Sequence, residues 1–184
     1  GYIWTQAPRW DIDISRASRG YDWVTVLRTL PFEKPGYQMY KKYISKIYKE
    51  NIEKFNRVYG QRVTNFEQNI NFSSIDKNNS QIRNDDEGFL RIIAHELFSY
   101  IYQTIKQYDD SHINFGDKFL LYDHPDCVLE EISPYVDVIA IQPGGGYNEM
   151  PFTPKDQPYY EKKFRKNIYD HINQVTGKPI VIAD

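Results

Sequence analysis

The sequence of 184 residues predicts an α/β fold built on parallel strands, about half of a (β/α)8 TIM barrel, with a helical insertion after the first strand. Three observations predict this fold class. Strand and helix patterns alternate along the second half of the chain, as in βαβ units. The expected strands at residues 136–142 and 178–184 are almost entirely apolar, which is typical of parallel strands covered on both faces. A series of helical patterns separates the first strand from the others.

A short strand opens the chain, and a long polar and helical segment follows it. Residues 2–5 form a run of aromatic and β-branched side chains, which is a strand pattern. Asp22 can cap a short helix, and Gly60 can end another. We predict one partial barrel domain over residues 1–184, with a helical and loop insertion over about 11–84. The expected helices of the insertion are residues 22–30, 40–47 and 51–59, and residues 62–84 are expected to be a loop with at most one short helix.

The second half of the chain has a more regular pattern. Apolar residues recur every three or four positions in its longest predicted helix, about residues 86–108. Gly177 marks the end of the last helix. Four strands leave two open edges, so the remaining part of the barrel is expected outside this segment. The other expected elements are a strand at 113–115 that could reach 121, a helix at 127–132, a strand at 136–142, a helix near 159–175 and a strand at 178–184.

Composition and charge exclude several classes of function. The formal net charge of -2 offers no basic excess for nucleic acid, and no window approaches the ~18 apolar residues of a membrane span. We therefore expect neither nucleic acid nor membrane as a partner. The single cysteine, Cys127, is expected to be a buried, inert thiol. His95 and Glu96 begin like a zinc-binding helix, but Ser99 occupies the position of the second histidine, so we expect no metal and no cofactor.

Polar side chains gather where the predicted strands end. In a parallel barrel all strands point their carboxyl ends at one face, so residues far apart in the sequence converge there. Aromatic rings beside hydrogen-bonding groups suit a polyhydroxylated ligand, which predicts a carbohydrate partner. The strand-end candidates are Gln6, Asp117, Lys118, Gln142 and Asp184, and the loops add Trp4, Arg9, Trp10, Tyr147 and Asn148.

Most of these candidates also have a structural explanation. Asp117 can make a turn, and Gln142 can satisfy backbone groups of a loop. The two tryptophans, Trp4 and Trp10, can belong to the core. Asp184 ends an apolar strand, where an acid needs a partner, and a structural salt bridge or a helix cap would also explain it. The convergence of several such residues therefore weighs more than any one of them.

Five stretches carry a family resemblance: residues 1–10, GYIWTQAPRW; 22–24, DWV; 116–119, GDKF; 135–142, YVDVIAIQ; and 176–184, TGKPIVIAD. Together they resemble glycoside hydrolases of the large (β/α)8 superfamily that carries its acid/base after strand four and its nucleophile after strand seven. The similarity is to β-agarase-like and β-galactosidase-like members, and it covers most of the chain. It implies that this sequence runs from about strand four to strand seven of the barrel.

The resemblance implies a glycosidase that acts on a galactose-containing or related polysaccharide or oligosaccharide, and an extracellular or periplasmic location. It puts Asp184 at the strand-seven position, as nucleophile or base, and Gln6 at the strand-four position, where an acid is expected. An amide cannot protonate a leaving group. Three explanations stay open: Gln6 replaces a native Glu, the acid comes from Asp11, Asp13 or a residue outside this segment, or the protein binds sugars without cleaving them.

Two other functions remain as alternatives to a glycosidase. The first is a non-catalytic carbohydrate-binding barrel, which the amide at Gln6 favours. The second is a different (β/α)8 or open α/β enzyme, which a phosphate-binding loop in the missing strands would favour.

Overall fold

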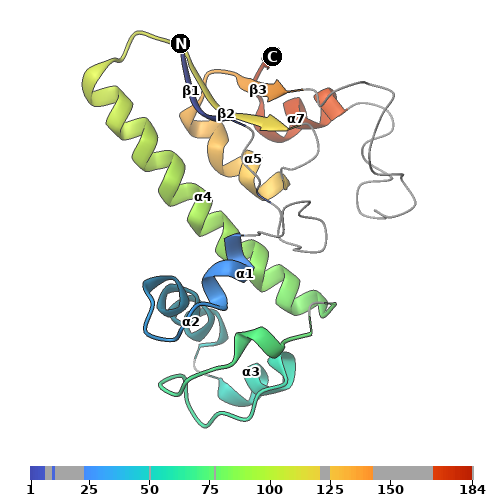
Figure 1. The fold of residues 1–184 in the computed structure, drawn as a ribbon. Coiled ribbons are helices and arrows are strands. Elements are labelled where there is room, and N and C mark those ends of the chain that lie inside the picture. Colours follow the sequence, from blue (N-terminus) through green and yellow to red (C-terminus); the bar gives the residue numbers. More distant parts are fainter. Residues whose placement is uncertain are drawn as a thin grey trace. The chain divides into compact units, whose positions relative to one another are not determined.

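The computed structural model describes residues 1–6, 10, 23–49, 51–76, 78–120, 125–142 and 168–183 of the chain (Figure 1). The chain divides into two compact units. The first unit comprises Gly1–Trp10 and Ile93–Asp184, and the second comprises Asp11–Ile92. The longest helix, α4 (Ser80–Tyr108), contributes residues to both units.

Four parallel strands form the sheet of the first unit. Their order in the sheet is β1-β2-β3-β4, which is also their order in the chain, and this confirms the predicted α/β class with a parallel sheet. A doubly wound sheet reverses its strand order at one point, whereas this sheet does not. Because βαβ crossovers are right-handed, an unreversed order brings the connecting helices to the same face of the sheet. The strands are β1 (Tyr2–Gln6), β2 (Asn114–Leu120), β3 (Ile139–Gln142) and β4 (Ile180–Ile182).

Short helices connect the later strands and fill the core of the first unit. They are α5 (Asp126–Ile132), the 3-10 helix η2 (Ser133–Tyr135) and α7 (Ile168–Thr176), and α5 packs against α7. Cys127 of α5 is buried and forms no disulfide, and its burial was predicted. Gly177 ends α7 with a φ of 65°, as its position in the sequence indicated.

Gly116 is the glycine that the packing of β2 requires. Its φ is 67°, a left-handed value that side chains with a Cβ rarely adopt. A Cβ at this position would lie 2.5 Å from Val136 Cγ1 and 2.9 Å from Ile132 Cδ1. The glycine therefore lets β2 lie directly against the end of α5 and the segment that follows η2.

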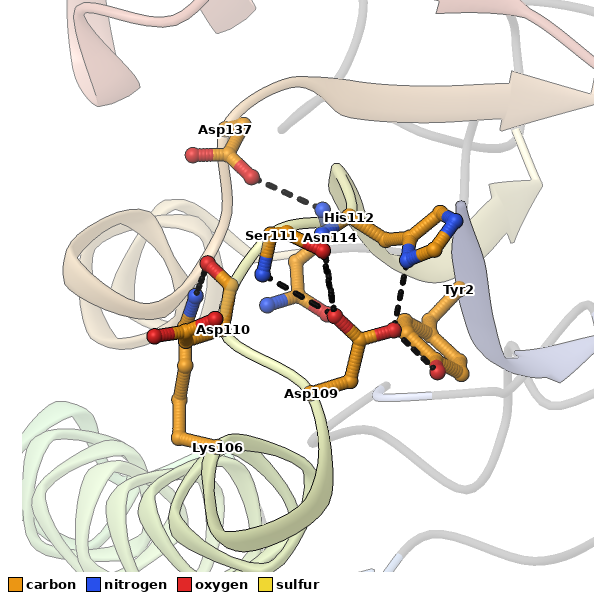
Figure 2. Close-up of polar contacts among 8 residues, drawn as sticks. All are labelled: Tyr2, Lys106, Asp109, Asp110, Ser111, His112, Asn114 and Asp137. Carbon is orange, nitrogen blue, oxygen red and sulfur yellow. Dashed lines mark hydrogen bonds and ion pairs between the residues drawn. The ribbon is translucent and has the colours of Figure 1, made fainter.

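Two strands differ from their predicted bounds. β3 begins at Ile139 rather than at residue 136, because the segment before it bonds to the start of β2 instead of joining the ladder. Asp137 donates its N–H to Asn114 O at 2.9 Å. The Asp137 carboxylate accepts the Asn114 N–H at 2.8 Å (Figure 2). β4 covers only Ile180–Ile182, and Ile182 is 55% exposed because β4 is an edge strand.

Asp109 organises the turn between α4 and β2 at the amino end of the sheet (Figure 2). One carboxylate oxygen accepts the Ser111 N–H at 2.9 Å and the His112 N–H at 3.2 Å. The other accepts the Tyr2 hydroxyl at 2.8 Å and lies 2.5 Å from His112 Nδ1. Hydrogen bonds from the Ser111 backbone and the Tyr2 hydroxyl hold the pKa of Asp109 well below its usual range. The turn is thereby joined to the first residue of β1.

The second unit is a helical unit with an aromatic core. Its rings pack at centroid separations such as 4.9 Å between Tyr40 and Phe72 and 4.7 Å between Phe55 and Tyr59. Asn51 caps α3 by accepting the Lys54 N–H. The elements are α1 (Trp23–Arg28), α2 (Pro35–Tyr48), α3 (Ile52–Tyr59), η1 (Phe72–Ser74) and the first turns of α4.

Two acids of α4, Asp85 and Asp86, lie in this aromatic core, 4% and 5% exposed. The Tyr48 and Tyr59 hydroxyls donate to Asp85 Oδ2 at 2.8 and 3.0 Å. Asp86 forms an ion pair with Arg28, whose side chain is also buried. Each buried carboxylate is thus paired or hydrogen-bonded, as burial in an apolar core requires.

These acids explain why α4 begins at Ser80 rather than near residue 86. The apolar repeat that predicts a helix is interrupted where Asp85 and Asp86 take core positions. The start is capped instead by Asn79, whose Oδ1 accepts the Gln81 N–H at 2.9 Å. The predicted loop therefore ends earlier than expected.

Removing the carboxylate of Asp86 will destabilise the second unit. Asp86→Ala leaves the Arg28 guanidinium buried without its ion pair, and we expect the free energy of unfolding to fall by about 3–5 kcal/mol. Chemical denaturation measures this change. The control, Glu67→Ala, removes an exposed side chain and should change stability by no more than about 0.5 kcal/mol. An Asp86→Ala protein as stable as the control would contradict this role for the ion pair.

Asp109 will make the stability of the first unit depend on pH. Its folded pKa is lower than its unfolded pKa of about 4, so its contribution is present above that value and is lost as the pH falls below it. Melting temperatures of the parent and Asp109→Asn, measured between neutral and strongly acid pH, should differ at neutral pH and converge in acid. A difference that stays constant across this range would show that the charge of Asp109 is not what stabilises the turn.

Candidate active site

The four strands of the sheet end at one edge. Gln6 is level with Lys118 in the pairing of β1 and β2, and Leu120 is level with Gln142 in the pairing of β2 and β3. The backbone of Ala183 continues along β3 by donating its N–H to Ile141 O at 2.9 Å. The carboxyl ends of β1 to β4 therefore form a continuous row, where parallel α/β enzymes carry their sites.

Asp117 and Lys118 lie inside β2 rather than at its end, because the strand continues to Leu120. Asp117 is fully buried, and its Oδ2 accepts the indole N–H of Trp10 at 3.2 Å. Neighbouring residues of a strand point to opposite faces, so Lys118 lies on the other face from Asp117. Lys118 is 6% exposed and, through the pairing of β1 and β2, lies beside Gln6.

The two tryptophans of the candidate set pack against α4. The ring centroid of Phe98 lies 5.9 Å from that of Trp4 and 5.2 Å from that of Trp10. Trp10 is only 1% exposed, so in this arrangement it belongs to the core and offers no open face to a sugar ring. Trp4 is half-buried, and its indole N–H is buried without a hydrogen-bond acceptor in the part of the chain that is described.

Gln142 ends β3 with an unsatisfied oxygen. Its side chain is half-buried, and within the described ranges its Oε1 is buried and accepts no hydrogen bond. A buried carbonyl without a donor costs about 1–3 kcal/mol. A ligand hydroxyl or amide N–H at this edge of the sheet would supply the missing donor.

The other predicted site residues lie outside the described part of the chain, either wholly or in their side chains. Asp184, Arg9, Tyr147 and Asn148 lie outside the described residues, and for Gln6 only the backbone is described. Of the predicted set, the sheet therefore brings together Gln6, Lys118 and Gln142 through its register, and Asp184 is the next residue after Ala183.

The structure shows one polar pair, His171 and Asp126, that the sequence does not indicate. His171 Nε2 lies 2.7 Å from Asp126 Oδ1, and both side chains are partly buried between α7 and α5. Asp126 and His171 lie in the first turns of their helices, and each helix follows a strand. The start of such a helix lies at the carboxyl end of the sheet, where the strands end. No local pattern announces this contact, because the two residues are 45 positions apart.

Among the described residues, no three His, Cys, Asp or Glu side chains gather closely enough to hold a metal ion. No helix in the described part is both long and apolar enough to cross a membrane.

Comparison with known proteins gives matches only among solved structures. No protein-family model matches the sequence, and no curated protein matches it. The agarase AgWH50C matches with a TM-score of 0.61 and 16% identity, over 86% of this chain and 20% of that one. PfGH50B matches with a TM-score of 0.59 and 19% identity, over 85% and 20%. An exo-β-agarase matches with a TM-score of 0.55 and 21% identity, over 63% and 16%.

These matches concern the fold, because the sequence identities are low. The chain spans a fifth or less of the length of each of the three structures. The resemblance to β-agarase-like glycoside hydrolases that the sequence indicated is thereby confirmed: this chain has the fold of part of the GH50 agarases.

Proposed function

We propose that this chain is the part of a (β/α)8 glycoside hydrolase that runs from strand four to strand seven, with the second unit as an insertion after strand four. The unbroken strand order β1-β2-β3-β4 supports this assignment, since consecutive barrel strands are neighbours in the sheet. The two edges support it as well: Ile3 on β1 and Ile182 on β4 are 50% and 55% exposed, as expected where further strands would pack.

The observation that carries the proposal is the row of strand ends. Gln6 ends β1 and Asp184 follows β4. The position expected to hold the acid/base and the one expected to hold the nucleophile therefore lie at the two ends of this row, on the two outer strands of the sheet. Barrel enzymes carry their catalytic groups at this edge, on several different strands. The substrate we propose is a galactose-containing or related polysaccharide, in keeping with the agarases that share the fold.

Each candidate residue then has a proposed role. Asp184 is the nucleophile or base, and Gln6 marks the acid/base position. Gln142 and Lys118 bind sugar hydroxyls, and Gln142 Oε1 has an accepting lone pair to offer. Trp4, Arg9, Tyr147 and Asn148 line the site. Trp10 and Asp117 act indirectly, because their mutual hydrogen bond fixes Trp10 against β2.

The second candidate function is carbohydrate binding without catalysis. In a retaining glycosidase a carboxylate bonds to the anomeric carbon while the leaving oxygen takes a proton from the acid. Gln6 has no such proton to give. An intact sugar site with an amide at this position would bind the polysaccharide and leave it uncut.

Hydrolysis of a panel of oligosaccharides by the full-length protein separates these two functions. If Gln6 occupies the acid/base position of an enzyme, Gln6→Glu should raise kcat/KM by at least about a hundredfold, and adding Asp184→Asn should abolish that gain. The matched control is Asp170→Asn, which changes an exposed acid of α7 and should leave the rate unchanged. A panel that binds while neither the parent nor Gln6→Glu turns it over would favour the non-catalytic barrel.

Gln142 offers a test of substrate binding that is independent of the acid. Gln142→Met keeps the size of the side chain and removes its unpaired carbonyl, so the melting temperature should stay the same or rise. The dissociation constant of the oligosaccharide should rise by at least about fivefold, because one hydrogen bond to the sugar is lost. Calorimetry of melting and of binding measures both. A lower melting temperature with unchanged binding would assign Gln142 a structural role.

A further inference from the structure

We infer that the second unit carries a binding site of its own for a neutral oligosaccharide, in a cavity of about 420 Å³. This volume falls in the range of about 300–1,000 Å³ that is common for small-ligand sites. The described residues that line the cavity all belong to the second unit. They come from two segments, residues 28–32 and 69–73, together with Tyr37 of α2.

The first segment supplies an apolar surface. Leu30, Pro31 and Phe32 follow α1, and Phe32 is 54% exposed although it borders a cavity. Its backbone is fixed by two contacts: Lys34 donates its N–H to Pro31 O at 2.9 Å, and the Gln38 side chain donates to Phe32 O. An exposed aromatic ring on a fixed turn is a platform on which the apolar face of a pyranose ring can stack.

The second segment supplies neutral hydrogen-bond donors. Asn69, Asn71 and Ser73 are exposed and line the same cavity. The two amide oxygens are used within the protein: Asn69 Oδ1 accepts from the Tyr37 hydroxyl at 3.0 Å, and Asn71 Oδ1 accepts the Ser73 N–H at 3.0 Å. Among the described residues, neither amide NH2 group nor the Ser73 hydroxyl has a hydrogen-bond partner, so all three can donate to a ligand.

The polar segment is held rigidly by the core of the unit. Tyr37 is 3% exposed, and its hydroxyl accepts the Ile70 N–H at 2.8 Å and lies 2.9 Å from Ile70 O. Ile70 and Phe72, each 1% exposed, anchor the segment on either side of Asn71. A site that is already ordered loses little conformational entropy when a ligand binds.

Charge selects a neutral ligand. Among the described residues that line the cavity, Arg28 is the only charged one, and its buried guanidinium is compensated by Asp86. A neutral cavity with an aromatic platform on one segment and amide and hydroxyl donors on the other fits the two kinds of surface that a sugar presents. The site does not depend on catalysis at the sheet, but the choice of an agarose-derived probe rests on the proposed function.

Hydrogen–deuterium exchange of the full-length protein with an agarose-derived hexasaccharide tests this site. We expect slower exchange in peptides that cover residues 28–38 and 69–75 when the sugar is present. Phe32→Ala should weaken binding at this site by about tenfold, as loss of one stacking ring predicts. Met39→Ala removes a side chain that is 50% exposed in the same unit and does not line the cavity, so it should bind as the parent does.

The inference is overturned if exchange in these peptides is the same with and without the sugar, or if Phe32→Ala retains the protection while remaining folded. Asn69→Ala provides a second variant, because it removes one amide donor and the Tyr37 hydroxyl can then donate to Ile70 O, which lies 2.9 Å away. Peptides over residues 139–142 report on the sheet edge separately. If the sugar protects only the peptides over residues 139–142, the cavity site is overturned and the proposed function is not. If the sugar protects the cavity peptides but is not hydrolysed, the result supports the cavity site and not the proposed glycosidase.

Discussion

Parallel pairing of strands in chain order is the constraint on which the first unit depends. Parallel neighbours cannot be joined by a tight turn, so each strand must be followed by a crossover that returns the chain to the amino end of the sheet. The crossover from β1 to β2 contains the whole second unit and α4, whereas the crossover from β2 to β3 needs only α5 and η2. Large insertions are tolerated in such connections because loop-closure entropy grows slowly with length.

The second unit solves a different problem, the burial of charge in an aromatic core. Asp85 accepts hydrogen bonds from tyrosine hydroxyls, and Asp86 forms an ion pair with Arg28. Burial, together with the negative charges of Asp85 and Asp86, raises the pKa of the neighbouring Tyr43 to about 12. Burial also raises the pKa of Tyr48 and Tyr59, so the two hydroxyls that donate to Asp85 are held in the protonated form.

The sequence predicted best those features that depend on local signals. The helix α3 ends before Gly60 as expected, and it begins one residue after the expected start because Asn51 is its cap; a cap and a left-handed C-terminal glycine both act within one turn. The interior strand β3 was recognised by its continuous apolar run, and it is buried as predicted. The start of α4 was missed because Asp85 and Asp86 occupy core positions, and only their partners from α1, α2 and α3 reveal why.

Non-local packing limited prediction of the candidate site. Asp117 and Lys118 looked like strand-end residues, but their neighbours in the sheet place them inside β2, and the acid is used by Trp10. The contact between Trp10 and Asp117 joins residues 107 positions apart, which no sequence period reports. Register is likewise a property of paired strands, so the alignment of Gln6 with Lys118 required the structure.

Asp109 and Gln142, at opposite ends of the sheet, differ in how their acceptor oxygens are satisfied. At the amino end, Asp109 has its acceptor oxygens filled by the turn and by Tyr2, an arrangement that serves stability. At the carboxyl end, the buried Oε1 of Gln142 has no donor among the described residues. Asn114 Oδ1, at the start of β2, is also without one, and nothing in the structure explains it. Parallel α/β enzymes bind their substrates at this carboxyl edge of the sheet. A hydroxylated ligand that donated a hydrogen bond to Gln142 Oε1 would offset the cost of burying that oxygen without a donor.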